Sequence, residues 1–224
     1  MLEGVTFSWL LVLALVISAV VGYLLGSINF AIITTRIKAD EDIRDFGSGN
    51  AGMTNVLRTL GKGPATWVLV GDFLKGLAAT LLGYLSVFLL TPENNIIIGG
   101  YIACIFALLG HLFPLYHGFR GGKGILVSAG AIAALNPIAF GVILLTFLIV
   151  VAISKIVSLA SISAAVMFPI ATVVIALLMG DQSIWFELAF SLIIAVLVIV
   201  MHRKNIGRLY RGEENRFGKK KHQK

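Results

Sequence analysis

Charged side chains and sulfur are both scarce in this sequence, and each shortage excludes a class of protein. Asp, Glu, Lys and Arg together make up 13% of the residues, whereas hydrophobic residues make up 58%. A soluble domain of 224 residues has no use for so much apolar surface, so the composition indicates a membrane protein. The single Cys104 can form no intrachain disulfide, and one thiol is too few for a metal site.

Several motifs of known chemistry are also missing. Neither His111 nor His117 is followed at the fifth residue by the Asp of the soluble and single-anchor glycerolipid acyltransferases, since Tyr116 and Gly122 stand there. The sequence has no Gly-x-Ser-x-Gly elbow, no array of metal-binding aspartates and no P-loop. These absences argue against a hydrolase with a serine nucleophile, a metal-dependent phosphotransferase and a nucleotide-binding fold.

Long apolar runs divide the chain and predict an all-α integral membrane protein, a compact bundle of about seven transmembrane helices. Residues 1–8 contain no Lys or Arg, so the first run reads as a retained span rather than a cleavable signal peptide. We expect one transmembrane domain over residues 1–202, with loops at 36–63 and 114–124 and a basic tail at 203–224. The apolar runs are Ser8–Thr35, Ala65–Leu90, Ile96–Phe113, Ile125–Leu135, Ile138–Ile153, Val157–Met179 and Ser183–Met201.

The positive charges predict the orientation of these spans. The net charge of +7 comes from Lys and Arg that collect between apolar runs and in the tail, which indicates the positive-inside rule and not nucleic-acid binding. We therefore expect an outside N-terminus, a cytoplasmic C-terminus and polar loops on the cytoplasmic face. Because Ile125–Leu135 is short, about 17 Å as a helix, five spans with a re-entrant hairpin at 125–153 remain the alternative to seven.

Two polar stretches are typical of anion binding. In the first, small residues around Gly47, Gly49 and Asn50 allow successive backbone N–H groups to face an anion, and Arg58 adds a cation. In the second, glycines surround Lys123 just before an apolar helix. An ordinary loop is the plain alternative for each. The further residues that we single out here are Ser48, Thr54, Asn55, Gly121 and Gly122, together with Ser27 and Arg44 upstream.

Ionisable groups also occur beside and within the apolar runs. Asp72 and Lys75 share a helix face and predict either a structural ion pair or support for the site. His111 reads as a hydrogen-bonded side chain or as a base. If the last span continues as a helix, His202 and Asn205 lie on one face where it leaves the membrane.

In register, these stretches resemble the bacterial acyl-phosphate:glycerol-3-phosphate acyltransferases. The matching segments are Gly26-Ser27-Ile28, Asp42-Ile43-Arg44, Gly-Ser-Gly-Asn-x-Gly-x-Thr-Asn, Asp72-x-x-Lys75-Gly76, Gly-His-x-Phe-Pro, Gly-Gly-Lys-Gly and His-Arg-x-Asn-Ile-x-Arg-Leu, spread over about residues 22–214. Departures are small, such as Met53 where Ala is usual and Arg120 where Lys is common.

The resemblance implies a bacterial plasma-membrane enzyme of phospholipid biosynthesis. Such an enzyme moves a fatty acyl group from acyl phosphate to the sn-1 hydroxyl of glycerol 3-phosphate, and yields lysophosphatidic acid and phosphate. It implies no cofactor and no metal, membrane lipids as surroundings, and an acyl-phosphate synthase as a functional neighbour. The catalytic residues it implies are His202, Asn205, Ser48 and Thr54, with phosphate or substrate bound by Arg58, Lys123, Gly47, Gly49, Asn50, Asn55, Gly121, Gly122, Ser27 and Arg44.

Two other classes of function stay open at this point. An organic-phosphate transporter also needs a cationic chamber, but it predicts polar residues at mid-membrane and usually an internal repeat, which is not visible here. A non-catalytic subunit of a lipid-synthesis complex needs only an amphipathic surface. It leaves the convergent glycine-framed cations unexplained.

Overall fold

The computed structural model describes residues 7–92, 94–180 and 184–216, and within them the chain is helical and contains no strand. The prediction of an all-α protein is therefore confirmed. Ser183, the predicted start of the last apolar run, and residues 217–224 of the predicted basic tail lie outside the described residues. The helices are α1 (Trp9–Ser27), α2 (Phe30–Ala39), α3 (Met53–Thr59), α4 (Lys62–Leu90), α5 (Ile97–Leu112), α6 (Ile125–Leu135), α7 (Pro137–Ser154), α8 (Val157–Met179), α9 (Ile184–Met201) and α10 (Arg203–Tyr210), with short 3₁₀ turns at Ile43–Asp45 and Leu115–His117.

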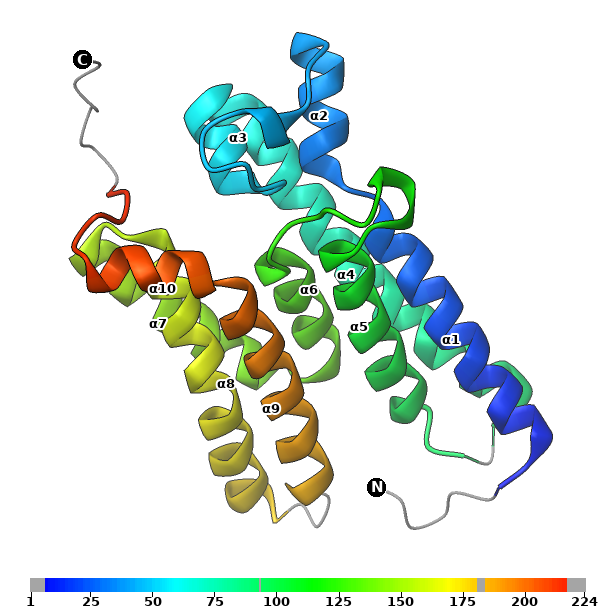
Figure 1. Ribbon diagram of the computed structural model, residues 1–224. Helices are drawn as coiled ribbons and strands as arrows, with labels where there is room; N and C mark the ends of the chain where they lie inside the picture. The colour runs from blue at the N-terminus through cyan, green and yellow to red at the C-terminus, as the bar shows by residue number, and fades with distance from the viewer. Residues whose placement is uncertain (1–6, 93, 181–183, 217–224) are drawn as a thin grey trace, which may run out of the picture. The chain divides into compact units, whose positions relative to one another are not determined.

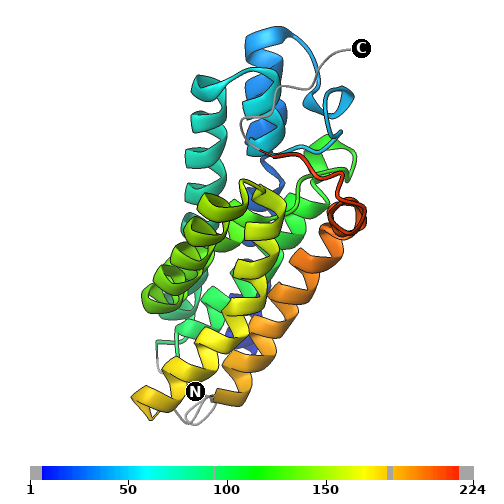
Figure 2. The ribbon, with the colours of Figure 1, turned by 90° about the vertical axis from the view of Figure 1, so that its left-hand side faces the viewer.

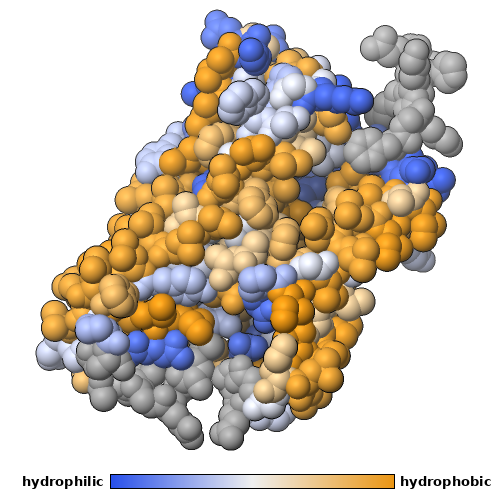
Figure 3. All heavy atoms as spheres, turned by 180° about the vertical axis from the view of Figure 1, so that it is seen from behind, coloured by the Kyte–Doolittle hydropathy of each residue, from blue (hydrophilic) through white to orange (hydrophobic). Residues whose placement is uncertain are grey.

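Six segments are long and apolar enough to cross a membrane, judged by length and composition in the described part of the chain. They are Trp9–Ala39, Lys62–Leu90, Ile97–His117, Pro137–Ser154, Val157–Met179 and Ile184–Met201. On the face shown in Figure 3, apolar residues cover most of the sides of these helices, as a lipid-exposed surface requires. The helix α6 is shorter and ends at Leu135, and α7 begins at Pro137, between the predicted runs Ile125–Leu135 and Ile138–Ile153.

The chain forms two compact units, residues 1–137 and 138–224. In the first unit α1, α4, α5 and α6 pack side by side (Figure 1). Glycines allow the backbones to approach closely: a Cβ atom at Gly26 would lie 2.1 Å from the carbonyl oxygen of Ala107, and one at Gly76 would lie 2.1 Å from that of Val127. Small residues at helix contacts are the usual means of tight packing in membranes, where no hydrophobic effect drives helices together.

The first span is interrupted where the sequence shows its polar Gly26–Asn29 segment. Helix α1 ends at Ser27, Ile28 has an extended backbone, and Asn29 caps α2 by accepting a hydrogen bond from the backbone N–H of Ile32 at 3.1 Å. The predicted span Ser8–Thr35 is thus built from two helices, because the Asn side chain satisfies a backbone donor that a continuous helix would bond internally.

In the second unit α8 and α9 pack side by side, and the rings of Phe168 and Phe190 meet edge to face. Helix α9 stops at Met201, and His202 separates it from α10, which turns sharply away (Figure 2). The sequence reading that one helix carries His202 and Asn205 is therefore not what the structure shows.

Candidate active site

The first glycine-rich loop, residues 47–52, is organised by one buried side chain, Asn55. Its Nδ2 donates to the carbonyl oxygens of Ile43, Phe46 and Asn50 at 3.1, 2.9 and 3.2 Å, and its Oδ1 accepts from the backbone N–H of Ser48 at 3.1 Å. Asn55 itself belongs to α3, so the first turn of that helix holds the loop that precedes it. We call the loop and α3, residues 47–59, the first cradle.

Glycine is required at two points of this loop by its backbone conformation. Gly47 and Gly49 have φ angles of +57° and +68°, which L side chains rarely adopt. A Cβ atom at Gly47 would also lie 2.4 Å from Oδ1 of Asn55. The turn that the glycines permit leaves Ser48 exposed and Asn50 and Thr54 partly exposed, and Arg58 projects from the last turn of α3.

The second polar segment, residues 113–124, is held by the ends of α1 and α5. The backbone N–H of Leu115 donates to Oγ of Ser27 at 3.2 Å, and the hydroxyl of Tyr23 donates to the carbonyl oxygen of Phe113 at 2.8 Å. Gly121 and Gly122 return to α5, their N–H groups donating at 3.1 Å to the carbonyl oxygens of Leu112 and His111.

Lys123 follows these glycines half-buried, and Gly124, with φ +82°, begins the turn into α6. We call residues 113–124 the second cradle. Lys123 thus reaches the surface from a backbone whose path is fixed on both sides, which suits a cation that must meet an anion at a defined place.

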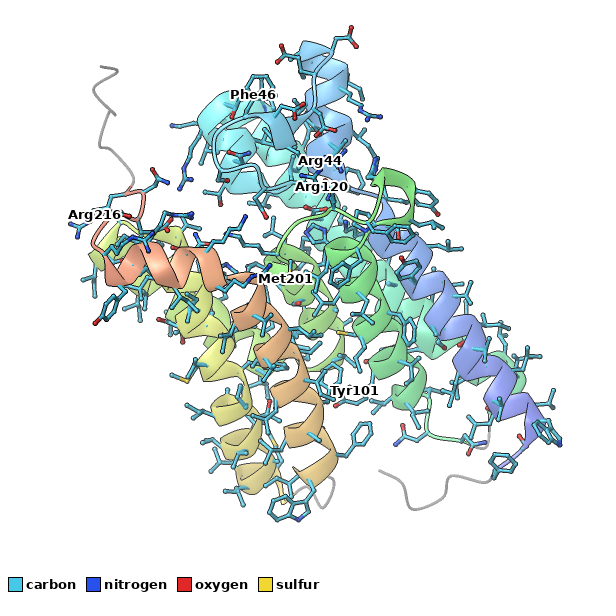
Figure 4. All side chains as sticks on the ribbon, in the orientation of Figure 1. Arg44, Phe46, Tyr101, Arg120, Met201 and Arg216 are labelled. Atoms are coloured by element: carbon cyan, nitrogen blue, oxygen red, sulfur yellow. The ribbon has the colours of Figure 1, made fainter. Side chains whose placement is uncertain are left out.

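The two cradles adjoin in the first unit. A Cβ atom at Gly122 would lie 2.6 Å from the carbonyl oxygen of Ala51, so only glycine allows this approach. Figures 1 and 4 show both segments at the same end of the unit as α2 and α3, opposite the turn from α4 to α5. The structure therefore brings together the sequence-predicted residues Ser27, Arg44, Gly47–Arg58 and Gly121–Lys123.

Arg44 forms a second link between the cradles. Its guanidinium donates to the carbonyl oxygens of His117 at 2.7 Å and Arg120 at 3.1 Å, and it pairs with the carboxylate of Asp42 at 2.7 Å (Figure 4). The Arg44 hydrogen bond holds the pKa of Asp42 below its usual value, against the opposing effect of burial. The predicted role of Arg44 in binding phosphate stays a prediction. Its observed contacts join Asp42 to the second cradle, and we call the Asp42–Arg44 pair with its bonds to His117 and Arg120 the strap.

The ion pair expected in the second span is present. Nζ of Lys75 lies 2.9 Å from Oδ1 of Asp72, and both side chains are buried. Nδ1 of His111 lies 3.0 Å from the same ammonium, so His111 is a hydrogen-bonded member of a buried cluster. In the part of the chain that the structure describes, no group of three or more His, Cys, Asp or Glu side chains is arranged to hold a metal ion.

The second unit carries its own polar cluster. His202 is buried, and its Nδ1 lies 2.8 Å from the carbonyl oxygen of Val198. Because a carbonyl only accepts, Nδ1 is the donor, and in the neutral ring Nε2 is then the acceptor. Glu214 accepts from Nδ2 of Asn205 at 3.1 Å and from Nε of Arg208 at 2.8 Å.

Glu214 and Asp42 are polar residues to which the sequence reading assigned no role. Each lies close in sequence to its partner, Glu214 nine residues after Asn205 and Asp42 two residues before Arg44. The only signal in the sequence was a carboxylate residue within nine positions of a predicted site residue. Spacing alone does not show that the two side chains meet.

Comparisons with known proteins agree with one another. Residues 16–212 match the model of the family described as glycerol-3-phosphate acyltransferase. The chain is 42% identical over 206 residues to the glycerol-3-phosphate acyltransferase of Clostridioides difficile, covering 92% of this chain and 97% of the relative. It is 44% identical over 211 residues to that of Thioalkalivibrio sulfidiphilus, covering 94% and 96%.

Solved structures give the same result at the level of the fold. The crystal structure of PlsY, an integral membrane glycerol 3-phosphate acyltransferase, in its glycerol 3-phosphate form superposes with a TM-score of 0.76 at 33% identity, covering 91% of this chain and 96% of that one. The lysophosphatidic acid form of PlsY gives a TM-score of 0.74, also at 33% identity, and covers 91% and 95%.

Proposed function

This chain belongs to the glycerol-3-phosphate acyltransferase family, and from that premise we propose that it acylates glycerol 3-phosphate with acyl phosphate as the donor. It is a multi-pass bacterial membrane enzyme that transfers an acyl group to glycerol 3-phosphate and forms lysophosphatidic acid. Acyl phosphate as the donor, the sn-1 hydroxyl as the acceptor group and the residue roles below are the proposal. The observation that supports it best is the pair of adjoining glycine-framed cradles with cationic side chains.

The chemistry needs little from the protein beyond position and charge. An acyl phosphate is a mixed anhydride whose carbonyl carbon is already activated. The substrate hydroxyl oxygen attacks that carbon, the bond from carbon to the phosphate oxygen breaks, and inorganic phosphate leaves with the electron pair. The protein must hold two phosphate-bearing substrates together and offset their charges.

We assign the phosphates to the two cradles. Arg58 and Lys123 are the cations, and Ser48 and Thr54 are hydroxyl donors beside them. These four side chains are partly or fully exposed at one end of the first unit. Of the side chains that shape the cradles, Asn55 and Ser27 are buried and Arg44 is hydrogen-bonded. Charged donors bind phosphate oxygens more strongly than neutral donors do.

The remaining residues divide into supports and a group that orients the acceptor. Asn55, Ser27 and Arg44 shape the cradles through the hydrogen bonds described above. His202 and Asn205, which belong to the second unit, keep the role that the family resemblance implies, which is to orient the acceptor. Nδ1 of His202 donates to the carbonyl oxygen of Val198, which fixes the tautomer of the neutral ring.

The donor is tested with purified protein in detergent, labelled glycerol 3-phosphate and either palmitoyl phosphate or palmitoyl-CoA. We expect lysophosphatidic acid from the acyl phosphate and none from the thioester. Comparable rates with the thioester, in a preparation free of phosphotransacylase, would overturn the donor assignment.

The proposed site also requires that both cradles lie on the cytoplasmic face of the membrane. Helix α4 has 29 residues, about 43 Å, and separates the cradles from the turn after Leu90. In a Cys104→Ser background, a single cysteine at Asn95 should react with an impermeant maleimide on intact cells. One at Gly118 should react only after permeabilisation, and reaction at Gly118 on intact cells would contradict a cytoplasmic site.

A further inference from the structure

The buried cluster of Asp72, Lys75 and His111 has no part in the acyl transfer described above, yet it joins three helices. Beyond Asp72 and His111, Nζ of Lys75 donates to the carbonyl oxygens of Gly26, at 3.0 Å, and Ile28. The exposed fractions of the three side chains are 2, 3 and 5%. The cluster therefore connects α4 with the end of α1 and with α5.

On the α1 side, Lys75 meets a helix terminus. The last carbonyl groups of a helix lack partners within it, and they carry partial negative charge. A buried ammonium satisfies these carbonyls at Gly26 and Ile28, just where Asn29 begins α2. Lys75 thus stabilises the end of α1 at the point where the polypeptide continues into α2.

On the α5 side, His111 meets the second cradle. The Lys75 ammonium has only donors, so Nδ1 of His111 accepts the bond, and the proton of the neutral ring lies on Nε2. The Nε2 edge faces Gly122, where a Cβ atom would lie 2.2 Å from it. The backbone carbonyl of His111 also accepts the Gly122 N–H at 3.1 Å.

We infer that Asp72, Lys75 and His111 are positioning residues that hold the second cradle in register with the α1–α2 break, and so hold the two cradles at their working separation. The inference rests on the proposed function. Stability alone does not account for the cluster, because apolar side chains of similar volume often replace a buried ion pair without loss of stability. A small displacement of reacting groups, in contrast, costs as much as about 100-fold in rate.

The main test replaces the ion pair by apolar residues. We expect the double variant Asp72→Leu/Lys75→Met to fold with a lowered thermal midpoint, because the carbonyl groups of Gly26 and Ile28 lose their donor, and to lose about 10- to 100-fold in kcat. The KM for glycerol 3-phosphate should change less than about threefold, because each cradle keeps its own phosphate-binding groups.

A second pair of variants keeps the test valid if the double variant does not fold. His111→Asn retains an acceptor where Nδ1 stands and should keep at least about a third of the kcat, whereas His111→Leu should lose about tenfold or more. The matched control is Ser86→Ala, which removes a buried hydrogen bond to Ser18 between α1 and α4, away from the cradles. It should leave kcat unchanged.

Folded double and His111→Leu variants with wild-type kcat would overturn the inference, and so would a failure of every variant except the control to fold. Equal losses in His111→Asn and His111→Leu would also contradict it. These outcomes are distinct from a failure of the proposed function, which would appear as wild-type protein that makes no lysophosphatidic acid from acyl phosphate.

Discussion

In the first cradle, Asn55 hydrogen-bonds to residues at most 12 positions away along the chain. In the second cradle, the bonds from Ser27 and Arg44 span 73 to 88 residues. Both loops carry a glycine-framed cation and adjoin each other. One of them, however, takes its shape from its own neighbourhood, whereas the other combines bonds to the nearby end of α5 with bonds to Ser27 and Arg44 far away in the sequence.

This difference teaches where each cradle is vulnerable. A loop closed by a nearby side chain loses little chain entropy on ordering, so its shape depends mainly on that side chain. A loop held by distant helices depends on how those helices pack. We therefore expect the first cradle to fail at one residue, and the second to lose its function gradually as one contact after another is removed.

The largest effect is expected for Asn55→Ala. The substitution removes four hydrogen bonds to buried or partly buried groups, each worth about 1 kcal/mol, and should lower kcat/KM by at least about 100-fold. Thr59→Ala, which removes one bond from the same helix to the carbonyl of Asn55, is the control and should change it less than about threefold. A fully active Asn55→Ala enzyme would show that the loop holds its shape without this side chain.

Lys123→Ala should have the next largest effect. A charge-assisted hydrogen bond is worth about 1.5–3 kcal/mol, so we expect a loss of at least about tenfold in kcat/KM for acyl transfer. The neighbouring exposed cation Arg120 contributes its backbone carbonyl to the strap, and Arg120→Ala should therefore lose less than about threefold. Equal losses in both variants would indicate general electrostatic attraction rather than a defined anchor.

Gly122→Ala tests whether the cradles must touch. The new methyl group would lie 2.2 Å from Nε2 of His111 and 2.6 Å from the carbonyl of Ala51, so the cradles must separate and kcat should fall about fivefold to tenfold. Gly118→Asn is the control, because Asn tolerates the left-handed φ of +65° and a Cβ atom there meets none of the described atoms within 4 Å. The measurement is the steady-state kcat of both variants, and an unchanged kcat in Gly122→Ala would show that the cradles need not touch.

The smallest effect concerns the strap. The pKa of Asp42 is lower in the folded protein than its ordinary value of 3.8, so the pair stabilises the fold above about pH 4, and this stability is lost as the pH falls through the lowered pKa. Asp42→Asn should therefore lower the thermal midpoint by about 2–4 °C at pH 7 and by less near about pH 3. An equal decrease at both values of pH would mean that the carboxylate charge does not contribute.

Much of the fold could be predicted because it depends on local composition. Val157–Met179 has the predicted bounds, and the helix break at Asn136-Pro137 lies between the predicted runs Ile125–Leu135 and Ile138–Ile153. Apolar runs, proline and glycine act on the backbone of their own neighbours. The sharp turn at His202 could not be predicted, because the Met201–Arg203 region contains neither glycine nor proline.

The sequence by itself determined that the protein is a helical membrane protein and which family it resembles, and it predicted two glycine-rich stretches with cations as the site. Each of these properties follows from the kinds of residue present and their order. Only the tertiary structure decided that Arg44 joins the two loops, that Ser27 holds the second of them, and that Lys75 connects the end of α1 to His111. A polar side chain specifies that it needs a partner, but several groups along the chain could satisfy it, and the packing of distant helices determines which of them lies within hydrogen-bonding distance.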